Sequence, residues 1–252
     1  IVRKYQVLRE KRNGRLADYL VTVNQSLSDI LYNYFSAKEK PLIIRNAPEL
    51  EPVRNSVDLK AMFNIPKEDK LLVFIGAHIY ARTHNHEQVI DEFGNQKGVH
   101  LLYITFFDKG CQDVKDYVSA KGFTNIYFHP AVKPAEICSY LSGADAGLVP
   151  TWNKKNLSYW YALDNKLFEY TIAEIPVLAT QQPEYRIILD EFKNGVCVNP
   201  DEKDAYIKGF KTILANYSTY KEHAIAAKQV INWNAEKKKL VDLYLKIEAS
   251  LN

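Results

Sequence analysis

The sequence predicts an α/β fold in which a parallel sheet is covered by helices on both faces. Eight short runs rich in Val, Ile, Leu and aromatic residues lack a strict polar alternation, which is typical of strands buried on both faces. Helical patterns separate these runs, and such alternation indicates a doubly wound sheet. The expected strands are residues 19–23, 41–45, 71–75, 100–105, 125–128, 146–149, 176–179 and 195–198.

Helices are expected between these strands. The first covers residues 26–36 and follows Asn24 or Ser26, either of which is a good helix N-cap. Three further segments place apolar residues at the i, i+3, i+4, i+7 spacing of one buried helical face. These faces consist of Ile137, Tyr140, Leu141 and Ala144, of Tyr206, Phe210, Ile213, Leu214 and Tyr217, and of Leu240, Leu243, Tyr244, Ile247 and Leu251. In folds of this class ligands bind beyond the carboxyl ends of the strands, so a site is expected in the loops there.

A domain boundary is expected in residues 47–69, where prolines and charged residues make poor strand or helix interiors. We expect this segment to be a linker and residues 70–252 to be the main domain. Residues 1–46 hold only two expected strands, and two strands do not form a stable sheet domain by themselves. They are therefore expected to be the end of a second domain that begins outside this chain.

Charge and composition narrow the range of partners. The 252 residues carry a net charge of +3, which does not favour nucleic acid and is compatible with an anionic small substrate or a weak contact with a membrane surface. The three cysteines have no metal or redox spacing and are expected to be free thiols in a reducing compartment. No apolar run is long enough to span a bilayer, and no signal peptide is visible. We therefore expect a cytoplasmic location, with the inner face of the membrane as a second expected place of action.

The loop after the third expected strand begins with Gly76. A glycine here lets the backbone approach a ligand, the following helix N-terminus favours an anion, and Arg82 is suited to bind a phosphate. The alternative is a solvated surface arginine. His78, His84 and His86 raise the alternative of a metal site, but no cysteine or carboxylate at ligand spacing completes the set, so no metal is expected.

A second candidate segment begins where Asp164 or Asn165 is expected to cap a helix. Lys166 then lies in the first helical turn, where the positive end of the helix dipole disfavours a cation unless an anion is near. This placement favours an anion site. Glu169 either accepts hydrogen bonds from sugar hydroxyls or forms a surface ion pair with Lys166, and the sequence leaves both interpretations open.

A third candidate is the loop at residues 128–134, which joins a strand to a helix. Pro130 and Pro134 stiffen it and leave backbone groups exposed at the carboxyl end of the strand. The loop is either a rigid turn or an edge that binds a nucleotide base.

The order of these segments resembles the family 4 (group 1) glycosyltransferases. The run Asn-Lys-Leu-Phe-Glu-Tyr at residues 165–170, followed by Ile-Pro-Val-Leu-Ala-Thr at 175–180, is similar to a signature of that family. Residues 128–150 resemble the strand, loop and Ala-Asp segment before that signature, and residues 195–200 resemble the strand after it. Residues 18–27 resemble the end of the family's first domain. The likeness covers nearly the whole chain.

The resemblance implies the GT-B fold, in which two Rossmann-like domains face a cleft and the second domain binds the nucleotide-sugar donor. This chain would hold the Rossmann-like donor domain and part of the other. Arg82 and Lys166 are implied to be catalytic, because they would hold the donor diphosphate and stabilise charge on the leaving group. Glu169 would bind the ribose hydroxyls, and the backbone from His129 to Val132 would contact the base. The implied donor-binding residues are Gly76, His129, Val132, Leu163, Asn165 and Glu169.

The resemblance also implies an activity. It implies a retaining, metal-independent glycosyltransferase without a cofactor that moves a sugar from a nucleotide-sugar to a glycan or lipid-linked acceptor in surface polysaccharide synthesis. The chain departs from the family pattern at Tyr161, where a glutamate is usual, at Thr83, where a lysine is usual, and at Glu174, where a glycine is usual. Two alternatives stay open. One is a non-catalytic nucleotide-sugar-binding module that pairs with a separate acceptor subunit. The other is a GT-B epimerase of nucleotide-sugars, which would need catalytic carboxylates and histidine in both halves.

Overall fold

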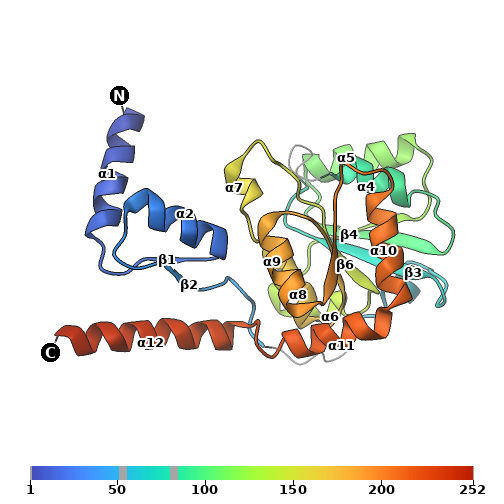
Figure 1. The fold of residues 1–252 in the computed structure, drawn as a ribbon. Helices are drawn as coiled ribbons and strands as arrows, with labels where there is room; N and C mark the ends of the chain where they lie inside the picture. The colour runs from blue at the N-terminus through green and yellow to red at the C-terminus, as the bar shows by residue number, and fades with distance from the viewer. Residues whose placement is uncertain (1, 51–55, 80–84, 252) are drawn as a thin grey trace. The chain divides into compact units, whose positions relative to one another are not determined.

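The computed structural model describes residues 2–50, 56–79 and 85–251 (Figure 1). The chain folds as two compact units, one made of Ile1–Ala47 with Trp233–Asn252 and the other of Pro48–Asn232. In the part of the chain that the structure describes, no helix is long and apolar enough to cross a membrane.

The larger unit is built on a six-stranded sheet in the order β5-β4-β3-β6-β7-β8, and every neighbouring pair of strands is parallel. All six expected strands of this sheet are present, with ends within two residues of the predicted ones. The predicted α/β class with a parallel sheet is thereby confirmed. The strands are β3 (Lys70–Ile75), β4 (Val99–Thr105), β5 (Ile126–Pro130), β6 (Ala146–Val149), β7 (Val177–Thr180) and β8 (Gly195–Val198).

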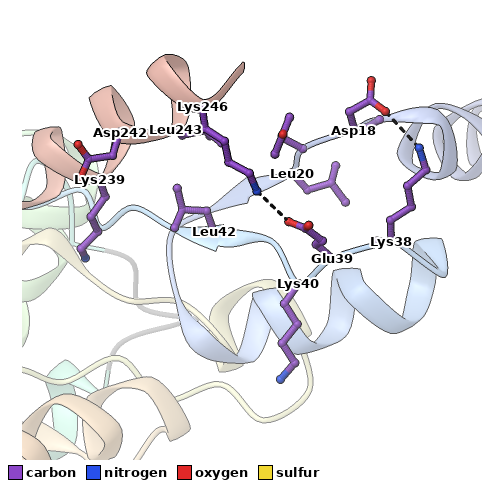
Figure 2. A pocket seen from close by; sticks show the side chains of 13 residues that line it. Asp18, Leu20, Lys38, Glu39, Lys40, Leu42, Lys239, Asp242, Leu243 and Lys246 are labelled. Carbon is purple, nitrogen blue, oxygen red and sulfur yellow. Dashed lines mark hydrogen bonds and ion pairs between the residues drawn. The ribbon is translucent and has the colours of Figure 1, made fainter. Parts of the chain in front are cut away.

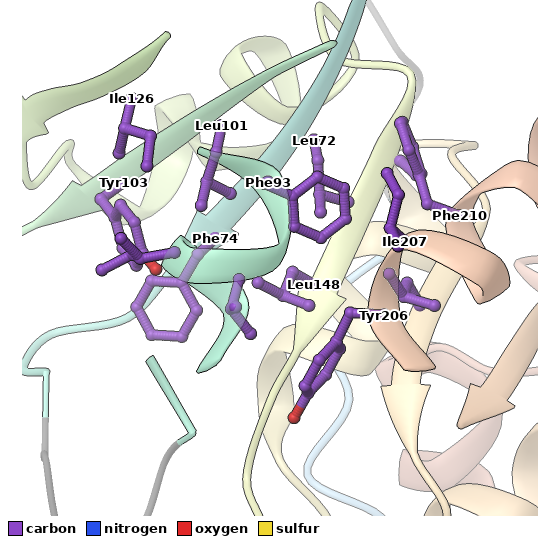
Figure 3. Packing of buried hydrophobic residues seen from close by; sticks show 14 of the residues in the cluster. Leu72, Phe74, Phe93, Leu101, Tyr103, Ile126, Leu148, Tyr206, Ile207 and Phe210 are labelled. Atoms are coloured by element: carbon purple, nitrogen blue, oxygen red, sulfur yellow. The ribbon is translucent and has the colours of Figure 1, made fainter. Parts of the chain in front are cut away.

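One face of this sheet is covered by α4 (His86–Phe93), α5 (Lys109–Ala120) and α10 (Ala205–Ala215). Alternate residues of each strand point to this face, so Leu72 and Phe74 of β3 meet Phe93 of α4 and Phe210 of α10 in one buried cluster (Figure 3). Burial of this many large apolar side chains is the main source of stability of the unit.

The opposite face carries the helices that position the candidate site. These are α6 (Ile137–Leu141), which follows the 3-10 turn η1 (Pro134–Glu136), and α8 (Asn165–Ile172), α9 (Pro183–Phe192) and α11 (Tyr217–Ala227). A four-residue helix, α7 (Leu157–Trp160), precedes α8. The apolar spacing predicted one helical face from Ile137 to Ala144, but α6 already ends at Leu141.

The smaller unit contains α1 (Val2–Leu16), β1 (Val21–Thr22), α2 (Gln25–Phe35), β2 (Leu42–Ile43) and α12 (Trp233–Leu251), and β1 pairs with β2 in parallel. Asn24 is the N-cap of α2, since its side-chain oxygen accepts the Leu27 N–H at 2.8 Å. The Phe35 ring packs where a side chain on Gly14 of α1 would lie. Both expected strands of this segment are present, but each is only two residues long.

The division into units differs from the expected domains at two places. Residues 47–69 were expected to be a linker, but α3 (Leu59–Met62) lies within them, Leu59 is fully buried, and the Val57 N–H bonds the Ser139 carbonyl at 2.9 Å. The last helix was expected in the large domain, but it packs in the smaller unit. Buried Glu236 of α12 accepts the Arg45 N–H at 3.0 Å and pairs with Lys239 at 2.7 Å.

Candidate active site

The sheet order reverses between β3 and β6, because the chain runs outward from β3 to β5 and then crosses back to β6. Such a switch point opens a crevice at the carboxyl ends of the two central strands. Here β3 and β6 pair only at Leu72–Ala146 and Val73–Gly147. The crevice that the fold class predicts therefore begins directly after these pairs.

Tyr170 of α8 bridges β3 and β6 at the floor of this crevice. Its hydroxyl accepts the Ile75 N–H of β3 at 3.0 Å and donates to the Leu148 carbonyl of β6 at 3.0 Å. Burial raises the pKa of Tyr170 far above its ordinary value, so the hydroxyl keeps its proton and remains a donor. One side chain thereby satisfies two backbone groups that the diverging strands leave unpaired.

A cavity of about 550 Å³ lies at this crevice. It is lined by the ends of three neighbouring strands and by the start of α8. The lining residues are Ile75, Gly76, Ala77, Ile104, Phe106, Ala131, Val132, Ile137, Leu163, Asp164, Asn165, Lys166 and Glu169. The charged side chains come from the start of α8, whereas the residues from β4 and from the loop after β5 are apolar. The lining thus has a charged part, with two carboxylates and one lysine, and an apolar part.

Six of the eight residues predicted for the site line this cavity, namely Gly76, Val132, Leu163, Asn165, Lys166 and Glu169. His129 is not among its lining residues. The His129 ring packs against Phe63 and Tyr140, and its Nδ1–H donates to the Pro130 carbonyl at 2.6 Å. Arg82, predicted to be catalytic, lies outside the described residues, as do Thr83 and His84.

Lys166 has a carboxylate neighbour that the sequence reasoning did not assign to it. Asp164 is the N-cap residue of α8, but its side chain makes no capping hydrogen bond. Instead its Oδ2 accepts from Lys166 Nζ at 2.9 Å and from Thr151 Oγ1 at 2.8 Å. The anion expected near Lys166 is therefore present in the protein itself. The signal for it was an aspartate two residues before a lysine at a helix start.

Glu169 lies one turn along α8 in the cavity wall. Burial raises the pKa of its carboxyl, and the charge of Lys166 opposes this rise with a smaller effect. Of the two interpretations left open for Glu169, a surface ion pair with Lys166 is not the arrangement found, because the Lys166 ammonium is bonded to Asp164 and Glu169 is half-buried. Lys166 also lies 5.4 Å from the centre of the Phe74 ring, which favours a cation at this position.

Phe106 is a cavity residue that the sequence reasoning missed. It follows β4, its N–H bonds the Ala77 carbonyl at 3.1 Å, and 52% of its surface is exposed. Two consecutive phenylalanines at the carboxyl end of a strand are a signal for an apolar ligand surface, since that end of the sheet is open.

The histidines considered as metal ligands have other partners where they are described. His78 Nδ1 lies 2.6 Å from the Asp108 carboxylate, and His86 is buried with its Nδ1 3.3 Å from the Tyr103 hydroxyl. Among the residues that the structure describes, no group of three His, Cys, Asp or Glu side chains is arranged to hold a metal ion.

A second cavity, of about 430 Å³, lies in the smaller unit (Figure 2). Four lysines line it, and each is paired with a carboxylate of the same unit. The pairs are Lys38–Asp18, Lys40–Asp29, Lys239–Glu236 and Lys246–Glu39. The cavity at the crevice is the better candidate, because it lies at the switch point of the sheet, where ligands of this fold class bind, and because six of the eight predicted residues line it.

The strand order and the crevice define a Rossmann-like α/β unit of the kind that binds nucleotides. The family model described as "Glycosyl transferases group 1" matches residues 69–216, which is more than half of the chain. The chain therefore belongs to this family. No curated protein sequence is similar enough to count as a match.

Solved structures show the same fold at low sequence identity. Sucrose-phosphate synthase from Thermosynechococcus elongatus is similar with a TM-score of 0.78 at 18% identity, over 98% of this chain and 62% of that one. The Anabaena protein HepE in complex with UDP has a TM-score of 0.75 at 12% identity, over 92% and 65%. A glycosyltransferase from Rickettsia africae has a TM-score of 0.76 at 13% identity, over 94% and 66%. This chain thus spans less than two thirds of the length of each of these proteins.

Proposed function

We propose that this chain is the donor-binding part of a glycosyltransferase that uses a nucleotide-sugar. The observation that carries the proposal is the cavity at the switch point, which Lys166 and Glu169 of α8 line together with the apolar side chains of Ile104, Phe106 and Val132. A nucleotide-sugar has the matching polarity, with a diphosphate between the sugar and an aromatic base.

In this proposal the diphosphate lies between the backbone at Gly76 and the first turn of α8. The helix N-terminus and the Lys166 ammonium favour its negative charge. During transfer the bond between the sugar and the diphosphate breaks, and charge accumulates on the leaving diphosphate. Lys166 then stabilises that charge, which is an electrostatic contribution to the rate. Arg82 is proposed to contribute in the same way.

The rest of the cavity is proposed to bind the nucleoside. Glu169 accepts hydrogen bonds from the ribose hydroxyls, and Phe106 with Val132 contacts the base. Desolvation of a carboxylate is costly, and donors such as ribose hydroxyls offset that cost when they bind. UDP is the first nucleotide to test, because HepE, one of the similar structures, was solved with UDP.

The finer assignments rest on the family resemblance and are part of the proposal. They are transfer with retention at the anomeric carbon, a glycan or lipid-linked acceptor, a role in surface polysaccharide synthesis and action at the inner face of a membrane. Independence from metals is proposed because Lys166 and the N-terminus of α8 supply positive charge at the diphosphate.

The test is calorimetric titration of this chain with UDP, GDP and ADP, each with EDTA and with Mg²⁺. We expect one of the three to bind equally well with and without the metal. Lys166→Met is expected to weaken that binding at least about tenfold, because a charge-assisted hydrogen bond is lost. Lys154→Met is the matched control, since Lys154 is an exposed lysine paired with Asp201 and does not line the cavity.

The outcomes separate the proposal from its alternatives. Absence of binding by all three nucleotides would overturn it. Binding by this chain without sugar transfer by the whole protein would favour the non-catalytic module. Release of an epimerised nucleotide-sugar by the whole protein would favour the epimerase.

A further inference from the structure

Lys166 and Asp164 form an ion pair in the cavity wall that is well shielded from solvent. Their side chains are 13% and 19% exposed. The Lys154–Asp201 pair in the same unit is 53% and 58% exposed. Solvent screens an exposed pair strongly, so such a pair holds its partners weakly, whereas a shielded pair restrains both side chains.

Asp164 is itself anchored to the sheet. Its Oδ2 accepts a hydrogen bond from the hydroxyl of Thr151. Thr151 is buried and is separated from the end of β6 only by Pro150. The Thr151 carbonyl in turn accepts the Thr180 hydroxyl at the end of β7, at 2.5 Å. The carboxylate is therefore held by the ends of two strands. A lysine ammonium on a flexible four-carbon chain takes its position from whatever holds it, and here that is the sheet.

We propose that Asp164 is a positioning residue, which, together with Thr151, holds the Lys166 ammonium at the place where the donor diphosphate binds. This inference rests on the proposed function, because it needs a diphosphate in the cavity. Lys166 keeps two further donor hydrogens when it bonds to Asp164, so it can bind a phosphate oxygen without leaving the carboxylate.

A positioning role for Asp164 and simple charge repulsion predict opposite changes in nucleotide affinity when Asp164 is removed. A carboxylate beside a diphosphate repels it, so on charge alone the removal of Asp164 should tighten nucleotide binding. If Asp164 positions Lys166, its removal should weaken binding instead, because the freed lysine must be ordered again each time the diphosphate binds. When Lys166 is absent, only the repulsion remains, and removal of Asp164 should then tighten binding.

The experiment is calorimetric titration of this chain with UDP, GDP and ADP, for Asp164→Ala and Asp164→Asn in the wild-type and Lys166→Met backgrounds. In the wild-type background we expect Asp164→Ala to weaken binding about five- to tenfold, as for loss of one restraining charged hydrogen bond. Asp164→Asn should weaken it less, because the amide oxygen still accepts from Thr151. In the Lys166→Met background both substitutions should tighten binding. Urea unfolding of each variant shows whether the fold is kept.

Asp201→Ala is the matched control, because it removes a carboxylate from the exposed pair with Lys154, away from the cavity. It should leave the affinity unchanged. Tighter binding by Asp164→Ala in the wild-type background, or the same direction of change in both backgrounds, would overturn the positioning role. If Lys166→Met does not change nucleotide binding, the proposed donor site fails first, and this inference fails with it.

Discussion

The aromatic ring of Tyr170 occupies the space beside the α-carbon of Gly147, where a β-carbon would lie only 2.2 Å from the ring Cγ. Gly147 is in the last β3–β6 pair, and Tyr170 carries the hydroxyl that bridges the two strands beyond it. The absent side chain at Gly147 therefore allows the tyrosine to reach the point where the strands separate. This contact fixes Tyr170 at the floor of the candidate site.

Gly147→Ala is expected to destabilise the larger unit by about 1–3 kcal/mol, the usual cost of overpacking a buried contact. Urea unfolding measures this loss. In a Tyr170→Ala background the same substitution should cost much less, because the added methyl no longer meets a ring. A Gly147→Ala variant as stable as the wild type would show that the ring moves aside freely.

Tyr170→Phe keeps the ring and removes only the hydroxyl. The Ile75 N–H and the Leu148 carbonyl then lose a buried partner, and we expect a loss of about 2 kcal/mol or more. Hydrogen exchange measured residue by residue should show faster exchange at Ile75 and little change at the distant end of β3. Unchanged exchange at Ile75 would contradict the bridging role of this hydroxyl.

Phe106→Ala tests the apolar end of the cavity. If Phe106 contacts the base, the variant should bind the nucleoside diphosphate about tenfold more weakly, as for loss of one aromatic contact with a base. Inorganic pyrophosphate, which has no base, should bind equally well to both proteins. Phe107→Ala is the matched control, because Phe107 is equally exposed but lies under Lys115 and does not line the cavity. Equal losses in the two variants would argue against a specific contact.

Glu169→Gln tests the buried carboxyl through pH. Burial raises the pKa of Glu169 above its usual 4.5, so in the pH range between the unfolded and folded pKa the folded protein keeps a proton that the unfolded chain releases. The free energy of unfolding therefore falls as pH rises from the unfolded pKa through the folded pKa of Glu169, and the loss is complete above the folded pKa. We expect Glu169→Gln to be more stable than the wild type at neutral pH, and the difference to disappear below pH 4.5.

Urea unfolding at stepped pH measures this difference. Glu191→Gln is the control, since it removes an exposed carboxyl near the end of α9. A stability difference for Glu169→Gln that does not change with pH would contradict the stated cause.

The strands were predictable because their signal is local. Runs such as residues 71–75 and 100–105 are apolar on both faces, and only a strand between two helical layers buries both. The short α6 was predicted less well, because the spacing from Ile137 to Ala144 also fits a short helix followed by a turn. Spacing reports which residues share a face and does not report where the helix ends.

The departure at Glu174 shows a limit of local reasoning. A glycine is usual at this position in the family pattern, and Glu174 adopts the left-handed conformation that favours glycine, with φ of 61°. Its carboxylate pairs with Lys228, which is nearly buried and follows α11. The sequence holds no sign that residues so far apart meet.

Most residues predicted for the site line one cavity, and their roles stay predictions. Lys166 was singled out by its place in the first turn of an expected helix, whereas the role of Glu169 was implied by the family resemblance. The resemblance implied that the backbone from His129 to Val132 contacts the base. Val132 lines the cavity and His129 is not among the lining residues, so the contact with a base stays a prediction.

The sequence by itself determined the α/β class, the strands and the helix that carries Lys166 and Glu169, because these depend on hydrophobic spacing and capping between near neighbours. Tertiary structure alone decided that β3 lies beside β6, that Asp164 holds Lys166 from an anchor on Thr151, and that α12 packs with the smaller unit. Each of these depends on contacts between residues distant in sequence or on the rotamer of one side chain. Burial and hydrogen bonding of the whole fold select among them, and no local pattern encodes that choice.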